Sequence, residues 1–251
     1  MCARPSFFPA VLIAAAALLP CLASRADEFA SIALTPPLDT LSVFDEAGPD
    51  LPFAHAGKVY FIQRTSYGTE LWATDGTPGA ESLVADIAPG AASGTLGGFI
   101  PASGGRFFLN ADDSGGVGTD AQGHGRELWI TDGTTGGTRL VKDINPGPDI
   151  GFTLFDRFVE LGGTYFFPAT AGGAYRGLYK TDGSEAGTEL VQDFSADGGT
   201  VLQMAVGLGK IWIVVRFQAE RREEVWISDG TAAGTAMLAD LGSNPIGIFP
   251  M

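Results

Sequence analysis

The chain has almost no cysteine and no extended helical pattern. Its two cysteines, Cys2 and Cys21, both lie within residues 1–26. If that segment is removed, no side chain remains that could form a disulfide, act as a thiol nucleophile, bind a metal through thiolates or attach haem. After residue 27 no stretch carries apolar residues with a sustained helical period, so the pattern argues against a helical fold.

Positive charge is also scarce. The sequence has 15 Lys and Arg against 29 Asp and Glu, a net charge of −14 at pH 7. Removing residues 1–26 takes away Arg4 and Arg25 and no acid, which leaves 13 basic and 29 acidic residues and a net charge of −16. A chain of this charge repels nucleic acid and anionic lipid, so we expect neither as a partner. The acidic residues could keep the chain soluble or could bind divalent cations, and we favour the role in solubility.

Residues 1–26 have the features of a secretory signal peptide. Arg4 supplies a positive charge, residues 11–19 form an apolar run, and Ser24 and Ala26 are small residues that suit a signal peptidase. Cleavage before Ser24 is the alternative. The apolar run is too short to span a bilayer permanently. We therefore expect a secreted protein, extracellular or periplasmic, with no stable membrane span after cleavage.

What the chain does contain is a sequence repeat. The motif Glu-Leu-Trp-x-x-Asp-Gly-Thr occurs four times in recognisable form, and a second Asp follows the first at the same interval in every copy. The spacing between successive motifs varies, which indicates a rigid unit joined by loops of variable length. The aromatic residue, first Asp and second Asp of the four copies are Trp72, Asp75 and Asp86; Trp129, Asp132 and Asp143; Tyr179, Asp182 and Asp193; and Trp226, Asp229 and Asp240.

Each unit has the signals of four β-strands. An apolar segment, a glycine turn and an aromatic, β-branched run such as Val59-Tyr60-Phe61-Ile62 come first; the Leu-Trp segment, the Asp-Gly turn and a last short run follow. Apolar side chains alternate onto both faces of the motif strand, as in a blade that lies between two others. The sequence predicts an all-β fold, a β-propeller-like array of four four-stranded repeats over residues 49–251.

The two ends of the array leave its closure open. Residues 247–251 resemble residues 98–102, the first strand of the second unit, so we expect a partial fifth strand at the C-terminus. Residues 27–48 form an N-terminal lead-in that has no Asp-Gly turn. This lead-in could complete a blade. We favour closure of one ring by the two termini, which would give a monomer. The alternative is a truncated form of a longer array.

At these motifs the chain resembles the bacterial ELWxxDGT-repeat family of exported proteins, over about residues 50–245. The segment from Gly123 to Trp129 matches the longer form of the family motif closely. The third unit departs from the motif at Gly177, Tyr179 and Ser184. The resemblance implies a surface or secreted repeat protein, and it brings no catalytic residues with it.

A residue found in every unit is expected to build the unit, so we assign a structural role to the repeated aromatic and Asp residues. The Asp of each Asp-Gly turn can accept a hydrogen bond from the amide two residues on. Alone it would supply one ligand, whereas calcium takes about six to eight oxygens. Glu70, Glu127 and Glu224 also recur at one position, so we expect a shared structural role at the blade surface and not paired-carboxylate catalysis.

Residues that occur once are better functional candidates. The second unit has a glycine-rich insertion that contains Asp112, Asp113 and Asp120. These three acids could hold calcium, but they lack the alternating spacing of a calcium-binding loop, so we favour a solvated loop and no cofactor. His55 and His124 are the only histidines, too few for a multi-histidine zinc site.

These patterns favour an exported, non-enzymatic repeat protein that acts as a binding or adhesion scaffold at or outside the cell surface. Its partner would be a glycan or a protein that the sequence does not identify. Two alternatives come from other classes. One is a hydrolase or lyase of extracellular polysaccharide on a propeller fold, and the other is a structural matrix protein whose role is repetition.

Overall fold

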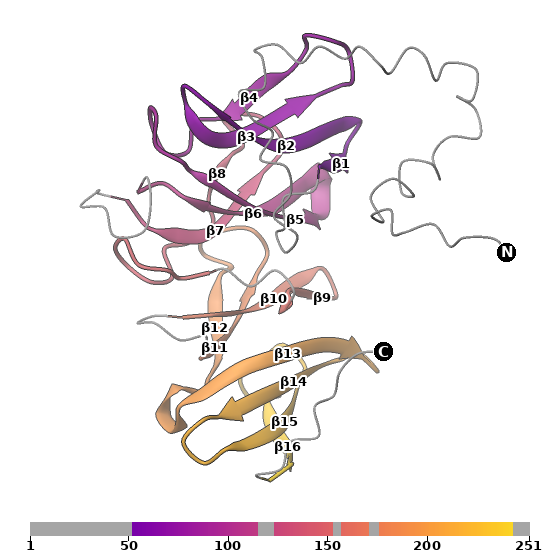
Figure 1. The fold of residues 1–251 in the computed structure, drawn as a ribbon. Coiled ribbons are helices and arrows are strands. Elements are labelled where there is room, and N and C mark those ends of the chain that lie inside the picture. The colour runs from indigo at the N-terminus through magenta and orange to yellow at the C-terminus, as the bar shows by residue number, and fades with distance from the viewer. Residues whose placement is uncertain (1–51, 115–122, 153–156, 171–175, 243–251) are drawn as a thin grey trace, which may run out of the picture.

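The computed structural model describes residues 52–114, 123–152, 157–170 and 176–242. These residues form four antiparallel sheets of four strands each, and in every sheet the strands pair in chain order (Figure 1). We call the sheets blades 1 to 4. The prediction of an all-β, propeller-like array of four four-stranded repeats is confirmed. The partial fifth strand, the lead-in and the signal peptide fall outside the described residues.

The strands have the following bounds. Blade 1 contains β1 (Phe53–His55), β2 (Lys58–Thr65), β3 (Gly68–Thr74) and β4 (Ser82–Ala85). Blade 2 contains β5 (Thr95–Ala102), β6 (Arg106–Asp112), β7 (Arg126–Thr131) and β8 (Arg139–Leu140). Blade 3 contains β9 (Val159–Leu161), β10 (Thr164–Ala169), β11 (Gly177–Thr181) and β12 (Glu189–Asp193). Blade 4 contains β13 (Gly199–Gly207), β14 (Lys210–Phe217), β15 (Arg222–Ser228) and β16 (Ala236–Asp240).

The same register recurs in all four blades. The motif lies on the third strand of each blade, and its aromatic residue always pairs with a residue in the middle of the second strand. These pairs are Phe61 with Trp72, Leu109 with Trp129, Phe167 with Tyr179, and Ile213 with Trp226. Equivalent positions can therefore be compared between blades residue by residue.

Successive blades pack face to face through apolar layers. Because side chains of a strand alternate between its faces, Phe107 packs toward blade 1 and Phe108 toward blade 3, and both are fully buried. The layer between blades 3 and 4 is built in the same way from Phe166, Leu178 and Ile213. Strands buried on both faces explain why the sequence runs are apolar at consecutive positions.

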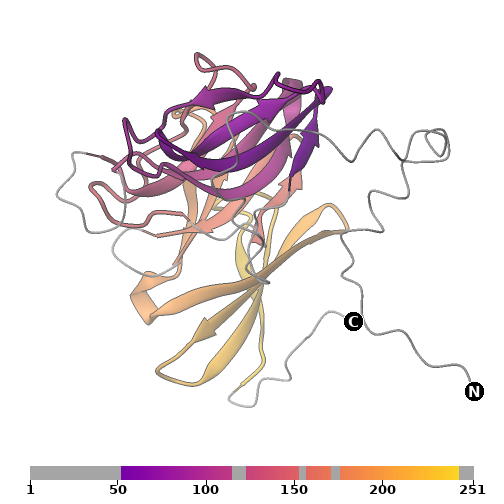
Figure 2. The ribbon, with the colours of Figure 1, turned by 45° about the horizontal axis from the view of Figure 1, so that its top comes forward.

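The four blades follow one another along an arc, and blades 1 and 4 lie at its opposite ends in both views (Figures 1 and 2). Among the described residues, the three apolar layers join blade 1 to 2, 2 to 3 and 3 to 4. The predicted pairing of residues 247–250 with the N-terminal segment lies outside the described residues, so ring closure stays a prediction. No helix in the described ranges is long and apolar enough to cross a membrane.

Candidate functional site

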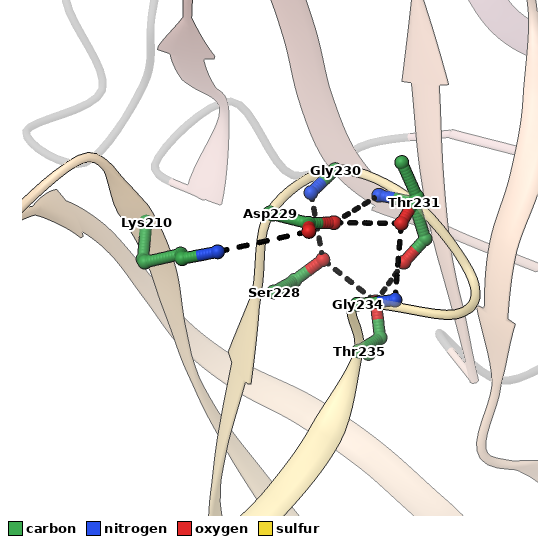
Figure 3. Close-up of polar contacts among 7 residues, drawn as sticks. All are labelled: Lys210, Ser228, Asp229, Gly230, Thr231, Gly234 and Thr235. Atoms are coloured by element: carbon green, nitrogen blue, oxygen red, sulfur yellow. Dashed lines mark hydrogen bonds and ion pairs between the residues drawn. The ribbon is translucent and has the colours of Figure 1, made fainter.

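The first Asp of each motif holds a hairpin turn. In all four blades its Oδ1 accepts the N–H of the residue two positions on, at 2.8–3.0 Å. In blades 2 to 4 the hydroxyl of that residue donates to the same oxygen at 2.6–2.7 Å, as Figure 3 shows for Asp229 and Thr231. These hydrogen bonds hold the pKa of each Asp carboxyl below its usual value. The carboxylate therefore accepts hydrogen bonds from its own turn.

The base of the same hairpin is closed by a second pair of hydroxyls. In blade 4, Ser228 and Thr235 lie 2.6 Å apart, and the equivalent pairs in blades 2 and 3 lie 2.7 Å apart (Figure 3). A glycine precedes the Thr of each pair, and a Cβ added at Gly234 would come within 2.0 Å of Asp229 Oδ1. Blade 1 has Ala80-Glu81 in place of this Gly-Thr and so lacks the second hydroxyl.

The Glu of the motif organises the loop that leads to the next blade. Glu70 and Glu127 are fully buried. Each carboxylate accepts the backbone N–H groups of the residues 17 and 18 positions later, at 2.9–3.2 Å. The expected shared structural role is present in these two blades, but its expected place at the blade surface was wrong. The carboxylate lies inside because the loop folds back over it and supplies N–H donors.

A glycine encloses the same carboxylate from the other side. Gly94 and Gly151 follow Glu70 and Glu127 at the same interval along the sequence. A Cβ added at Gly94 would lie 2.6 Å from Glu70 Oε1, and one added at Gly151 would lie 1.9 Å from Glu127 Oε1. Because each carboxylate is enclosed, neither Glu70 nor Glu127 can contact a substrate as one of a catalytic pair.

Blades 3 and 4 vary this arrangement. In blade 4 the Glu224 carboxylate accepts bonds from the Arg222 guanidinium and, at 2.7 Å, from Trp226 Nε1. In blade 3 Gly177 replaces the Glu, and the loop amide of Phe194 donates instead to the Arg176 carbonyl at 2.7 Å. A cavity of about 90 Å³ lies at this position and is lined by Ala169, Thr170, Arg176, Gly177, Tyr179, Leu190, Asp193 and Ser195.

The insertion of the second unit is flanked by a polar pair with no counterpart in the sequence of the other repeats. Asp113 accepts the backbone N–H of His124 at 2.6 Å, and its other oxygen lies 2.7 Å from His124 Nδ1. Hydrogen bonding to Asp113 raises the pKa of the His124 imidazole. The His124 side chain is 47% exposed and that of Asp113 18%. This pair is a once-occurring polar feature that solvent can reach.

Asp112 and Asp143 lie beside the pair. Asp112 is only 1% exposed and accepts hydrogen bonds from the amide and hydroxyl of Ser114. Burial, and then the charge of Asp113, raises the pKa of Asp143, whereas the charge of His124 lowers it. We therefore take Asp113, His124 and Asp143 as the candidate site, and call it the blade-2 rim.

The second Asp of each motif ends its repeat, and the structural role assigned to it would be to bind the amides of the following loop. Three of the four do so: Asp86 accepts from Gly90 at 3.3 Å, Asp193 from Ser195 at 2.7 Å and Asp240 from Gly242 at 2.8 Å. Asp143 is the exception, since its buried Oδ1 has no hydrogen-bond partner among the described residues. The expectation was wrong for this residue, whose surroundings are those of the blade-2 rim.

The two calcium candidates that the structure describes bind different partners within the protein. Asp112 is turned to Ser114 and Asp113 to His124, while Asp120 lies outside the described residues. Over the described ranges there is no group of three or more His, Cys, Asp or Glu side chains suited to a metal ion. His55 lies in a different blade from His124, on β1, where its ring stacks on Phe53.

Sequence reasoning missed both the enclosed glutamates and the blade-2 rim. The glutamates had a signal, because the interval from Glu to the crowded glycine is the same in the first two units. The rim had none. Asp143 occupies a repeated position, and the contact between Asp113 and His124 spans an insertion whose path cannot be read from its composition.

No protein-family model and no curated protein matches the chain. Among solved structures it is similar to the acylaminoacyl peptidase of Pyrococcus horikoshii, with 14% identity, 76% of this chain and 27% of that chain covered, and a TM-score of 0.42. An apocarotenoid oxygenase of Synechocystis is 12% identical, with 78% of this chain and 52% of that chain covered and a TM-score of 0.44. A TolB-like protein of Agrobacterium tumefaciens is 14% identical, with 74% of this chain and 62% of that chain covered and a TM-score of 0.38. These are β-propeller proteins, of whose length the chain spans between about a quarter and three fifths, and the likeness concerns fold alone.

Proposed function

We propose that this chain is an exported protein of the ELWxxDGT-repeat type that acts as a non-enzymatic binding or adhesion scaffold at or outside the cell surface. The observation that carries the proposal is a division of the polar residues into two groups. The turn Asp of every blade and the enclosed Glu70 and Glu127 are hydrogen-bonded within the blades, whereas the solvent-accessible Asp113–His124 pair of the blade-2 rim has no counterpart in the other repeats.

The first group supports a scaffold. The turn Asp is bonded to its own hairpin in every blade, and Glu70 and Glu127 are enclosed by the following loop. The hydrolase or lyase alternative needs carboxylates that a substrate can reach, and the buried Glu70 and Glu127 do not meet that need, while the exposed turn Asp is bonded within its own hairpin. A matrix role would suit a surface that is the same in every repeat, and the blade-2 rim breaks that uniformity.

The second group supports binding. A carboxylate paired with an imidazole offers acceptors and a nitrogen that can donate, which suits the hydroxyl and amide groups of a glycan or a peptide. The sequence charge of −14 disfavours polyanionic partners, so the proposed ligand is a neutral or cationic surface glycan, with a surface protein as the second possibility.

A binding screen tests the proposal. The purified protein would be applied to an array of neutral, cationic and anionic surface glycans and to isolated cell-wall material. We expect binding to a neutral or cationic glycan that is lost in Asp113→Asn and His124→Ala. The control is Glu189→Gln, which removes the same charge from an exposed ion pair with Lys180 on blade 3 and should bind normally. Failure to bind any glycan or cell-surface protein, or binding that ignores both rim substitutions, would refute the proposal.

A further inference from the structure

Blade 4 presents to solvent a face that is buried in the other three blades. We call the forward face the side of a blade that, in blades 1 to 3, packs on the next blade. Three equivalent positions build it: one on the second strand, one on the motif strand, and the residue two positions before the second Asp, which lies on the last strand or directly after it. In blades 1 to 3 these are Tyr60, Leu71 and Val84; Phe108, Leu128 and Val141; and Phe166, Leu178 and Val191, all no more than 5% exposed.

In blade 4 the same positions are apolar but more exposed. They hold Trp212, Val225 and Leu238; Leu238 is 55% exposed and the other two are half-buried. Leu238 corresponds to valines that are 1–5% exposed in the other blades. The face has the composition of a blade-to-blade contact, and no fifth blade lies on it among the described residues.

Blade 1 has the matching side, on which no other blade packs among the described residues. We call the opposite side of a blade its backward face, which in blades 2 to 4 packs on the preceding blade. Two second-strand positions define it, and they are buried in each case: Phe107 and Leu109, Tyr165 and Phe167, and Ile211 and Ile213, none more than 8% exposed. In blade 1 these positions are Val59 and Phe61, which are half-buried and belong to none of the three apolar layers.

We propose that the forward face of blade 4 binds the backward face of blade 1 of a second copy of this chain. The chain already makes this kind of contact three times within itself, forward face on backward face. The two faces lie at opposite ends of the arc in both views (Figures 1 and 2), and among the described residues no blade of the same chain packs on either of them. The proposal goes beyond the binding function and does not depend on it.

Two copies joined in this way close a ring. Each copy contributes one forward and one backward face, so a two-fold dimer satisfies both contacts with two identical interfaces. Four blades from each chain give eight, and closed propellers typically have about four to eight blades. A single open arc would expose an apolar blade face to water at each end. Closure by a second copy covers both faces.

The oligomeric state tests the proposal. The purified full chain would be run in size-exclusion chromatography with light scattering over a wide concentration range, and we expect a dimer that dissociates on dilution. Leu238→Asp on blade 4 and Phe61→Asp on blade 1 each place a charge in both interfaces and should weaken dimerisation on the order of 100-fold or more. Leu208→Asp is the control, since Leu208 is 93% exposed in the turn between β13 and β14.

Mixing the two interface variants adds a test that loss of folding cannot imitate. A mixed pair has one interface in which both partners are unaltered, so the mixture should form more dimer than either variant alone. A wild-type monomer at every concentration would overturn the proposal and mean that the face is covered within one chain. A ladder of species larger than two copies would also overturn it, in favour of an open filament.

Discussion

Two acids of the motif experience opposite electrostatic surroundings at the residue scale. The turn Asp is exposed, and N–H and O–H donors lower its pKa, so its charged form is favoured. Glu127 is buried, and loss of hydration raises its pKa to about 8, although two loop amides and the charge-stabilising N–H of Leu128 act against the shift. One sequence string thus contains one acid that is stabilised as an anion and one that is stabilised as a neutral carboxylic acid.

Replacing Asp132 by Ala should destabilise the protein without abolishing a specific activity. The substitution removes the acceptor of the Thr134 amide and hydroxyl, at 2.9 and 2.6 Å. Loss of such a cap costs about 1 kcal/mol, within a range of roughly 0.5–2. Thermal unfolding checks this, and Asp132→Asn, which keeps the Oδ1 acceptor, should lose less. An unchanged melting temperature together with lost ligand binding would contradict the structural role.

Glu127 should make the protein less stable as the pH rises. Its folded pKa of about 8 is above the ordinary value of 4.5, so its contribution is fully present below about pH 4.5 and is lost as the pH rises through about 8. Both loop amides donate to one oxygen, Oε1, which Glu127→Gln retains. Denaturant unfolding from pH 5 to about pH 9 should therefore show the wild type losing stability relative to Glu127→Gln. Parallel stability curves would contradict the assignment.

At the element scale, the loop between two blades is held by groups that are far apart in the sequence. In the first two units a buried carboxylate on the motif strand takes two amides of the loop, and a glycine later in the loop passes next to it. The N–H groups of Gly94 and Gly151 donate back to the residue before the Glu, at 3.1 and 2.9 Å. This arrangement fixes where the next blade begins, because the chain enters the next sheet soon after this glycine.

Gly151→Ala should be much more destabilising than Gly136→Ala. The added methyl at residue 151 would lie 1.9 Å from Glu127 Oε1, whereas at residue 136 it would meet nothing within 4 Å. Neither glycine has a positive φ, so the difference measures crowding and not backbone strain. We expect a loss of about 1–3 kcal/mol or more at residue 151 and less than about 1 kcal/mol at residue 136. Equal melting temperatures of the two variants would show that the loop can move away.

The strand order could be predicted from the sequence because its signals are local. Asp-Gly turns, aromatic runs and alternation onto two faces lie close to each other along the chain in every unit, and they predicted the four meanders. The interior place of Glu127 was not predicted, because an ionisable side chain is expected at the surface and its amide partners are 17 and 18 residues away. The contact of Asp113 with His124 likewise spans the insertion.

At the scale of the whole molecule, the array is close to one-dimensional. The apolar layers join each blade only to its neighbours in sequence among the described residues, so the blades in the middle have two covered faces and the end blades have one. An end blade in such an array opens more readily than a central one, because fewer apolar contacts oppose its local unfolding. The composition of the end faces, not the length of the chain, then decides which oligomeric state the protein adopts in solution.

Hydrogen exchange should reveal this gradient and its dependence on a second copy. At low concentration, where the protein is monomeric, amides of β15 in blade 4 should exchange faster than those of β7 in blade 2, whose blade is covered on both faces. As the concentration rises, protection of β14 to β16 and of β2 should increase, while that of β7 should change least. Exchange followed by mass spectrometry over a wide range of concentration measures both effects. Equal protection of β7 and β15 at every concentration would mean that the forward face of blade 4 is covered within a single chain.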